Sequence, residues 1–334
     1  MFDSIPTSTL VYSATAVSTL SALYYAYHRY RGGHLCPPDR VDGQIIVITG
    51  ATSGIGKATA EELVKRGAVV VLACRNLTAA NKLALDLTKK AQNSNQPGRA
   101  TAMYLDLSSI KSVFEFVDLL KKDFSKIDIL INNAAVWGSE KRVITEDGFE
   151  EHFQVNHLAP LALSILTAPL LNNSEEARLI FVSSDLYKRG QIDFENLDSQ
   201  KNYSPRQAYA NSKLMQVLCA QEMARNIKVN GFNSVSVYTC RPGVVNTGLF
   251  RHAFRNPVSK LFGGMLLKFL LKTPYQGAQT ILFCAAARSL RNHSGKFYGN
   301  CREEALKTEI SKDALLAKKL WDLSLAKLNI NFVK

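Results

Sequence analysis

The chain has 334 residues, 46% of them apolar, which is enough for one large α/β domain or for two small ones. It carries 41 Lys and Arg against 28 Asp and Glu, a formal net charge of +13, yet has no zinc finger and no run of aromatics interleaved with arginine. We therefore expect no nucleic-acid partner. The six cysteines form no CxxC pair and no metal-like spacing, which predicts reduced thiols and no metal site.

The positive charge is concentrated in the final quarter of the chain. Residues 251–334 contain fifteen Lys and Arg against five Asp and Glu, whereas residues 1–43 contribute no net charge. A basic surface of this kind favours contact with an anionic membrane, and a role in solubility alone is the alternative.

Residues 1–31 are predicted to form an N-terminal membrane anchor. Residues 9–27 are nineteen uncharged residues, close to the ~20 that a helix needs to cross a bilayer. Arg29 and Arg31 follow this span while Asp3 precedes it, which places the C-terminal side in the cytosol. A cleaved or organelle-targeting sequence is the alternative. Residues 32–43 would then be a linker.

From residue 44 onward, apolar runs rich in β-branched residues alternate with helical patterns. This alternation predicts an α/β fold with a doubly wound parallel sheet of about seven strands, in a single domain covering residues 44–334. The expected buried strands are 44–49, 68–74, 100–105, 127–132, 177–183 and 234–240. Residues 295–299 would add a seventh strand, and residues 314–329 a final amphipathic helix.

A glycine-rich turn follows the first expected strand and leads into a helix. Gly50, Gly54 and Gly56 have the spacing GxxxGxG. Such glycines allow a tight turn, a close approach of backbone to a pyrophosphate, and a helix N-terminus that favours anions. With Ser53 and Ile55 they are predicted to bind a dinucleotide cofactor, and a plain turn is the alternative.

The end of the second expected strand indicates which dinucleotide binds. NAD-binding units place an acid there, on the ribose 2′-hydroxyl. This chain has Cys74 and Arg75, and the next acid is Asp86. Because an arginine would pair with a 2′-phosphate, NADP(H) is the predicted cofactor. NAD(H) is the alternative, with Arg75 then a solvated surface residue.

Two further strand ends supply cofactor contacts. Asp106, followed by Leu107, comes after the third strand, where its carboxylate would accept a hydrogen bond from the adenine amino group. Asn133 and Ala134 end the fourth strand, at the mouth where open α/β sheets bind ligands, and would line the cofactor ribose. The neighbouring Asn132 would tie strands together.

Tyr209 and Lys213 are spaced four residues apart in an expected helix, so their side chains would point the same way. The lysine charge is expected to favour the ionised phenol, which would make Tyr209 a general acid or base near neutral pH. Lys213 would also bridge to the nicotinamide ribose, so both residues are predicted cofactor contacts as well. Ser184, at the end of the fifth strand, would hold the reacting oxygen, with Ser183 pointing away. Asn156 would hold a water that relays protons to Lys213.

The YxxxK pair is a weak motif by itself, but the ordered set GxxxGxG, NNA, Asn, Ser and YxxxK strongly resembles the short-chain dehydrogenase/reductase family. The resemblance covers residues 44–299 and implies a Rossmann-like fold. It also implies that Asn156, Ser184, Tyr209 and Lys213 form a catalytic tetrad. The run PGVV with a threonine two residues later resembles the family's cofactor-closing loop, whose members here are Pro242, Gly243, Val245 and Thr247.

Within this family the chain resembles the membrane-anchored retinol-dehydrogenase-like group. The N-terminal anchor, the runs ACRN, DGFEEHFQVNHL and PGVVNTGLFRH, and the long gap between Ser184 and Tyr209 carry this resemblance. The runs RYRGG, YSPRQAYANSKL and KTPYQGA are similar to the X-linked member, which is linked with polyprenoid lipids. Ala135 replaces the usual glycine of NNAG, and Arg75 differs from the X-linked member, so the cofactor preference stays open.

Residues 245–275 are expected to cover the substrate. An apolar surface there would admit a lipid tail, with a row of cations at the membrane interface. The apolar residues are Leu261, Phe262, Met265, Leu266, Phe269 and Leu270, and the cations are Lys260, Lys268 and Lys272. An ordinary buried helix is the alternative.

The predicted activity is reversible hydride transfer between NADP(H) and the alcohol or carbonyl carbon of a membrane-dissolved lipid, of the retinol/retinal type. A polyprenol or dolichol-pathway lipid, or a steroid, is an alternative substrate, and an inactive NADP(H)-sensing membrane scaffold is the remote alternative. The relatives imply the endoplasmic reticulum membrane, with the catalytic domain facing the cytosol, or a lipid droplet. A homodimer is one alternative for the assembly.

Overall fold

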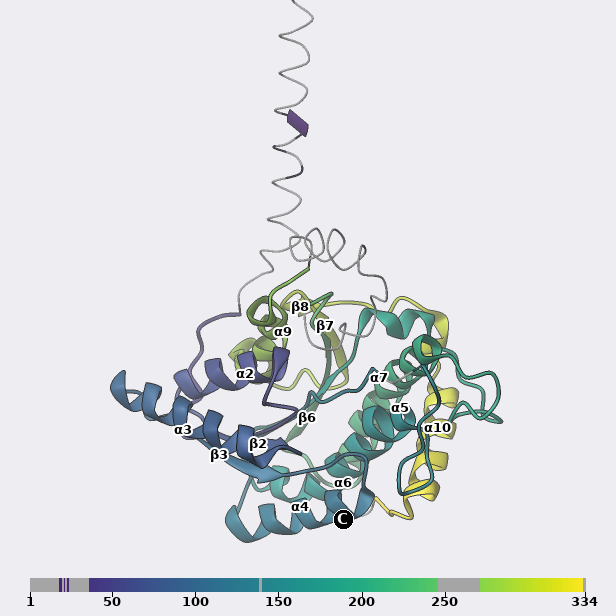
Figure 1. Cartoon of the computed structure of the whole chain (residues 1–334), viewed down its shortest axis with the longest axis horizontal. Coiled ribbons are helices and arrows are strands. Elements are labelled where there is room, and N and C mark those ends of the chain that lie inside the picture. The colour runs from purple at the N-terminus through teal and green to yellow at the C-terminus, as the bar shows by residue number, and fades with distance from the viewer. Residues whose placement is uncertain are drawn as a thin grey trace, which may run out of the picture.

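The computed structural model of the chain describes residues 18, 19, 21 and 23 and residues 36–137, 140–245 and 271–332. Within these residues an eight-stranded sheet has the order β3-β2-β1-β4-β5-β6-β7-β8 (Figure 1). The strands are β1 (Ile45–Thr49), β2 (Val69–Cys74), β3 (Arg99–Tyr104), β4 (Ile129–Asn132), β5 (Ala177–Val182), β6 (Val235–Arg241), β7 (Lys296–Gly299) and β8 (Arg302–Glu303).

The first seven strands pair in parallel and β8 pairs antiparallel with β7. The predicted α/β fold class is therefore confirmed, including the seventh strand. The short β8 was not predicted, because its two exposed residues form neither an apolar run nor an alternating pattern in the sequence. The order of the strands reverses between β1 and β4, and ligands bind beside the carboxyl ends of strands at such a point.

Most strands lie where the apolar runs predicted them, within two residues at each end. β2 and β5 are buried along their whole length, which explains their uninterrupted apolar sequence. β3 differs, because it is the edge strand and alternates between exposed and covered residues up to the half-exposed Tyr104. Its prediction as a buried strand was wrong.

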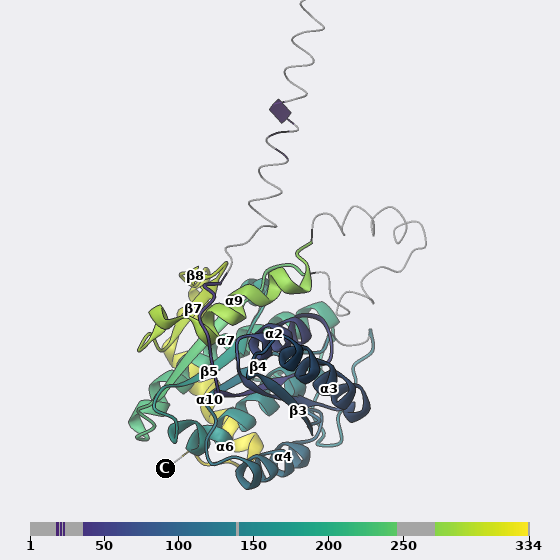
Figure 2. The ribbon, with the colours of Figure 1, turned by 90° about the vertical axis from the view of Figure 1, so that its left-hand side faces the viewer.

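Helices cover both faces of the sheet. In the described residues they are α2 (Gly54–Lys65), α3 (Leu77–Asn93), α4 (Ile110–Asp123), α5 (Glu151–Phe153), α6 (Ala159–Asn172), α7 (Pro205–Val229), α9 (Pro274–Ala286) and α10 (Ala314–Leu328). A π-helix, η1 (Gln154–Leu158), joins α5 to α6, and 3-10 turns form η2 (Asp185–Arg189), η5 (Arg288–Leu290) and η6 (Glu309–Lys312). Figure 2 shows α2 and α9 on one side of the sheet and α4 and α6 on the other.

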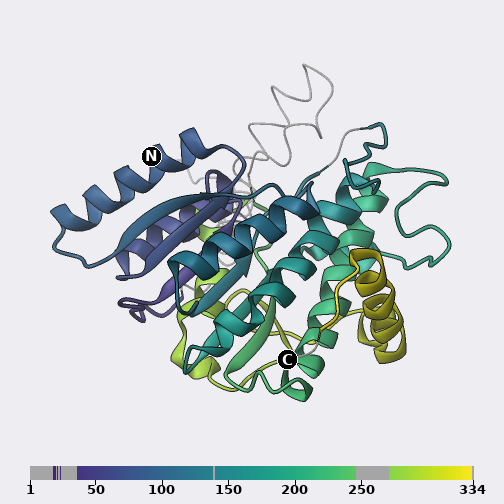
Figure 3. The same cartoon turned by 90° about the horizontal axis from the view of Figure 1, so that it is seen from below.

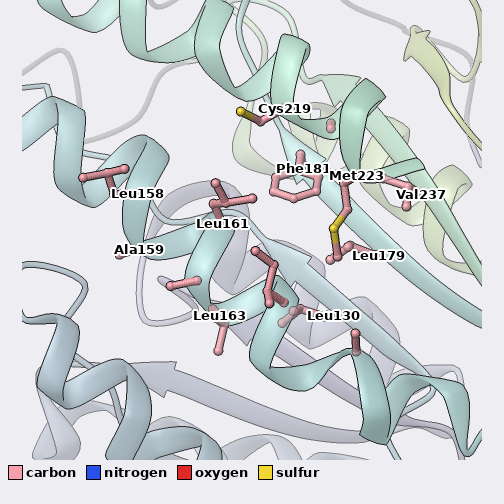
Figure 4. Packing of buried hydrophobic residues seen from close by; sticks show 14 of the residues in the cluster. Leu130, Leu158, Ala159, Leu161, Leu163, Leu179, Phe181, Cys219, Met223 and Val237 are labelled. Atoms are coloured by element: carbon pink, nitrogen blue, oxygen red, sulfur yellow. The ribbon is translucent and has the colours of Figure 1, made fainter. Parts of the chain in front are cut away.

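Two apolar cores result, one on each face. Ile46 and Ile48 of β1 join residues of α2, α3 and α9 in one core, while Val47 joins residues of α4, α6 and α7 in the other. Figure 4 shows part of the second core, where Leu161 of α6 lies near Phe181 of β5. The predicted final helix, α10, packs on the outside of α7 (Figure 3). Because a core packs on each face, the sheet holds the ends of its strands in fixed positions.

The N-terminal predictions lie mostly outside the described residues. Ser18, Thr19, Ser21 and Leu23 are helical and exposed, and the rest of residues 1–35 is not described. From Cys36 on, the predicted linker packs against the domain: the Cys36 amide donates to the side chain of Gln279, 3.0 Å away.

One helix in the described part of the chain is long and apolar enough to cross a bilayer. It runs from Glu151 to Asn172, and 89% of its apolar window is buried inside the protein. Its apolar residues therefore pack in the second core.

Candidate active site

The glycine turn after β1 leads into the N-terminus of α2, whose first residues line a cavity. Gly50 and Gly54 have φ values of +67° and +54°, a conformation that favours glycine. Ser53 precedes α2 without a side-chain cap, and the first turn of α2 holds no acid. A Cβ on Gly56 would lie 2.4 Å from the Gly50 carbonyl oxygen, so the backbone must stay bare there. Backbone amides and the helix dipole are therefore available to an anion.

A cavity of about 950 Å³ opens between this turn and the carboxyl ends of the neighbouring strands. Every predicted site residue that the structure describes lines it, except Asn156. They are Gly50, Ser53, Gly54, Ile55, Gly56, Arg75, Asp106, Leu107, Asn133, Ala134, Ser184, Tyr209, Lys213, Pro242, Gly243 and Val245. Thr247 lies outside the described residues. The fold thus brings together residues separated by almost 200 positions in the chain.

The end of the cavity beside β2 carries a cation. Arg75 directly follows β2 and is exposed, and Asn76 caps α3 by accepting from the amide of Ala79 at 2.9 Å. Asp106 also lines the cavity, with its carboxylate held by the amide and hydroxyl of Ser108 at 2.9 and 2.7 Å. The predicted basic group after β2 and acidic group after β3 therefore border one space.

Asn133 and Ala134 are fixed to β1 by hydrogen bonds. Both amides donate to the Thr49 hydroxyl, at 3.0 and 2.9 Å, and the Asn133 side chain donates to the Thr49 carbonyl at 2.9 Å. The side chain of Asn133 thus holds the glycine turn against β4. Asn132, predicted to tie strands together, instead donates to Ser164 of α6 at 2.8 Å.

Tyr209 is 4% exposed, on the first turns of α7. Its ring lies between Trp137, 4.6 Å away between centroids, and the edge-on ring of His152 at 6.2 Å. Ser184, which caps the start of η2, lines the same cavity. Burial raises the pKa of Tyr209 to about 12, and the Ser184 side chain opposes this rise. The expected lowering by the lysine charge was therefore wrong for the cofactor-free chain, because desolvation dominates.

Lys213 is 1% exposed, and its ammonium nitrogen lies 5.7 Å from the centre of the Tyr209 ring. The ammonium donates to the carbonyl of Val182 at 3.0 Å and to the side chain of Gln216 at 2.8 Å. Burial lowers the pKa of Lys213 to about 7. The expected common face with Tyr209 is therefore present, but the lysine is close to half-charged at neutral pH.

Asn156 lies in the π-helix η1, behind the cavity wall. Its amide oxygen accepts from the Val136 amide at 2.8 Å, and its amide nitrogen donates to the Val136 carbonyl at 3.0 Å and to the Ser212 hydroxyl at 3.1 Å. These bonds tie the segment after β4 to α7. The side chain of Asn156 therefore acts on the position of its neighbours, and the water that we predicted it to hold is not tested.

The sequence did not indicate several residues of the site. Trp137 is an isolated aromatic next to NNAAV, and nothing in the pattern predicts its contact with Tyr209. Gln216 follows Lys213 at helical spacing, which could have suggested a partner. Arg189 and Arg206 line the outer part of the cavity.

The predicted position of Lys272 was wrong. We predicted it in a row of cations facing a membrane, but it is 4% exposed and donates to Asn300 at 2.8 Å. The other residues of that predicted surface, between residues 246 and 270, lie outside the described residues.

Comparisons with known proteins agree with this arrangement. A family model described as short chain dehydrogenase matches residues 44–257. Retinol dehydrogenase 14 from Homo sapiens is 36% identical over 333 residues, covering 93% of this chain and 97% of that protein. Retinol dehydrogenase 13 from Mus musculus is 38% identical over 298 residues, covering 87% and 86%. The similarity to the X-linked member stays a prediction.

Solved structures share the fold. An uncharacterized protein from Mycobacterium Paratuberculosis has a TM-score of 0.68 at 28% identity, covering 89% of this chain and 97% of that one. L-sorbose reductase from Gluconobacter frateurii, complexed with NADPH and L-sorbose, has a TM-score of 0.61 at 21% identity, covering 78% and 96%. From its motifs, its fold and these relatives, the chain belongs to the short-chain dehydrogenase/reductase family of nicotinamide-dependent oxidoreductases.

Proposed function

We propose that the protein is an NADP(H)-dependent oxidoreductase that interconverts a lipid alcohol and its aldehyde or ketone. One observation carries this proposal: Tyr209, Ser184 and Lys213 meet in the same cavity that the glycine turn and Arg75 line. Reduction of a carbonyl by a nicotinamide cofactor needs the hydride donor beside the carbon and a proton donor beside the oxygen, and this cavity has a place for both.

The residues of the cavity fit a nicotinamide dinucleotide. The start of α2 would hold the pyrophosphate, because its residues line the cavity and a helix N-terminus favours anions. Gly56 lets the turn close, since a Cβ there would meet the Gly50 carbonyl and the Asn133 side chain. Arg75 would pair with a ribose 2′-phosphate, which favours NADP(H) over NAD(H), and Asp106 would receive the adenine amino group. The bound cofactor supplies or accepts the hydride; the chain's own residues manage the proton and the oxygen.

Tyr209 is the proposed proton donor. With a pKa near 12, its phenol is protonated at neutral pH, so it can donate a proton to the oxygen of a carbonyl substrate. The hydroxyl of Ser184, which lines the same cavity, would hold that oxygen. Alcohol oxidation would need the phenolate, which is scarce at neutral pH. Burial therefore favours reduction, although the bound cofactor's charge also acts on this balance.

The relatives guide the choice of substrate. The similar proteins are named retinol dehydrogenases, so a retinoid-type primary alcohol or aldehyde is the first substrate to test. Val136, Trp137 and Val155 give the cavity an apolar wall beside Tyr209, which suits the tail of a retinoid or a polyprenoid. A steroid remains a third alternative.

We further propose that residues 1–31 anchor the enzyme in the endoplasmic reticulum membrane, with the catalytic domain in the cytosol, and that a lipid droplet is the alternative site. The basic final quarter of the chain supports contact with an anionic surface. A homodimer is compatible with this arrangement.

The test is cofactor turnover by the detergent-solubilised full chain. All-trans-retinal, a polyprenal and a ketosteroid would be offered separately, each with NADPH and with NADH, to wild type and to Tyr209→Phe. The proposal expects turnover of one substrate class with NADPH and its loss in the variant. If the wild-type chain binds NADPH but reduces none of the three, the result favours the inactive sensing scaffold over the enzyme.

A further inference from the structure

Lys272 is a buried cation that the proposed chemistry does not use. It lies just before α9, below the segment Pro242–Val245 that lines the cavity, and its own side chain does not line it. We propose that Lys272 is a positioning residue, whose side chain holds residues 242–245, here called the β6 loop, in the shape that receives the cofactor. The identity of that cofactor rests on the proposed function.

Lys272 touches every residue of the β6 loop. Its ammonium donates to the Pro242 carbonyl at 3.4 Å, and its backbone amide donates to the Val244 carbonyl at 3.0 Å. Val245 and Lys272 also form a parallel β-bridge. One residue therefore fixes the course of the loop by both its backbone and its side chain.

Gly243 packs directly on the lysine side chain. Its φ is +84°, and a Cβ placed there would lie 3.2, 3.3 and 3.4 Å from Nζ, Cε and Cδ of Lys272. The extended side chain thus forms a floor under the glycine. A side chain at position 243 would therefore crowd Lys272, so this part of the loop is matched in shape to the lysine only with glycine there.

The position of Lys272 is itself fixed from two directions. Thr273 begins α9 with a capping box shared with Gln276, which sets where the backbone of Lys272 leaves the helix. The ammonium donates to the side chain of Asn300 at 2.8 Å, beyond the end of β7. The loop is therefore joined through Lys272 to both α9 and the turn after β7.

Helix α9 also packs against the last residue of the loop. A Cβ on Gly277 of α9 would lie 2.6 Å from Val245 and 3.2 Å from Ile55, the residue that follows Gly54 in the cofactor turn. Val245 is thereby packed between α9 and the start of α2. A shift of the loop would change the wall of the cavity next to the glycine turn.

The charge environment argues against a purely structural reason for a lysine. Both oxygen partners of the ammonium are neutral, whereas the nearby carboxylates of Asp185 and Glu304 pair with Arg241 at 2.7 and 2.9 Å. Burial, and then the Arg241 charge, lower the pKa of Lys272. A buried cation without an anionic partner opposes folding, so an apolar residue would suit stability better.

The test compares Lys272→Met with Lys318→Met. Methionine keeps much of the side-chain volume but removes the donor, and Lys318 is an exposed control, paired with Asp322 on α10. Amide hydrogen exchange of the peptide covering residues 241–245, in the cofactor-free chain, reports the loop directly. Kd for NADPH from fluorescence titration and Tm are measured on the same samples.

For Lys272→Met we expect faster exchange in that peptide, a Kd for NADPH raised about tenfold, and a Tm equal to or above that of wild type. Lys318→Met should leave all three unchanged. Exchange and Kd that match wild type would overturn the proposal, as would a large fall in Tm with exchange raised throughout the domain, since that marks general destabilisation.

Asn300→Gly is the second variant. Asn300 has a φ of +50°, which glycine adopts without strain, so the change removes the acceptor of the ammonium and leaves Lys272 in place. Asn300→Gly should also speed exchange in the peptide covering residues 241–245 and raise the Kd for NADPH, by smaller factors than Lys272→Met. If wild type binds neither NADPH nor NADH, the proposed function fails, but the exchange data on the cofactor-free chain still decide whether Lys272 holds the loop.

Discussion

The cavity has two ends that are built from different parts of the chain. We call them the cofactor end and the catalytic end after their proposed roles. At the cofactor end, bare backbone at Gly50, Gly54 and Gly56 forms the surface, and the charged Arg75 is exposed. At the catalytic end, the buried side chains of Tyr209 and Lys213 form it. The shape of the backbone is therefore decisive at the cofactor end, whereas desolvation determines the pKa values of the side chains at the catalytic end.

This difference has a consequence for mutations. A change that removes only the phenol of Tyr209 should alter rate and leave cofactor affinity alone, and a change at the cofactor end should do the reverse. The first three variants below test whether the two ends are separable in this way, and the fourth tests the desolvation of Lys213.

Tyr209→Phe should have the largest effect. The phenylalanine keeps the ring between Trp137 and His152 but removes the phenol, so we expect kcat to fall by about 10³-fold. Kd for NADPH should stay within about twofold of wild type, as measured by fluorescence titration. A comparable loss of cofactor affinity would show that the two ends are not separable.

Gly56→Ala should act at the opposite end. Its Cβ would meet the Gly50 carbonyl at 2.4 Å and the Asn133 side chain at 2.5 Å, so the turn must shift. We expect Kd for the cofactor to rise about 100-fold and stability to fall by about 1–3 kcal/mol. Gly148→Ala is the matched control, because nothing lies within 4 Å of its added Cβ, although its φ of +83° brings backbone strain. Normal binding by Gly56→Ala would remove the glycine turn from the site.

Arg75→Ala should separate the two cofactors. Losing a charged partner of a 2′-phosphate should weaken NADPH binding about 10- to 100-fold, since hydrogen bonds to charged groups contribute about 1.5–3 kcal/mol. NADH binding should not change. Parallel titrations of both cofactors check this, and equal effects on NADPH and NADH would contradict the assignment of Arg75 to the 2′-phosphate.

Lys213→Met is the fourth variant, and the measured quantity is the dependence of stability on pH. The pKa of Lys213 falls from 10.5 to about 7 on folding. Between these pH values the unfolded chain binds more protons than the folded one, so this group makes the free energy of unfolding increase with pH.

The variant should lack that increase. Relative to Lys213→Met, the wild-type Tm should therefore rise by a few degrees from pH 7 to pH 10. Thermal unfolding of both proteins across this range measures the difference. Curves that stay parallel would mean that Lys213 keeps its ordinary pKa in the folded chain.

The sequence alone determined the fold class and about half of the residues that border the cavity, 16 of 34. Strands that are buried on both faces appear in the sequence as continuous apolar runs. A helix N-terminus with accessible backbone amides requires glycines. Both features can therefore be recognised in a short stretch of sequence. The places of Gly50 and Ser184 after strands, and of Tyr209 and Lys213 on one helix, could therefore be predicted from the sequence.

Tertiary structure decided what local patterns do not encode. The pKa of Tyr209 depends on Trp137 and other distant residues that bury it, and helical spacing to Lys213 carries no information about desolvation. Likewise, Lys272 reads as a surface cation by sequence, but the turn at Asn300 and the β6 loop enclose it. Burial is a property of the assembled fold, so the charges of the site followed from packing and not from sequence spacing.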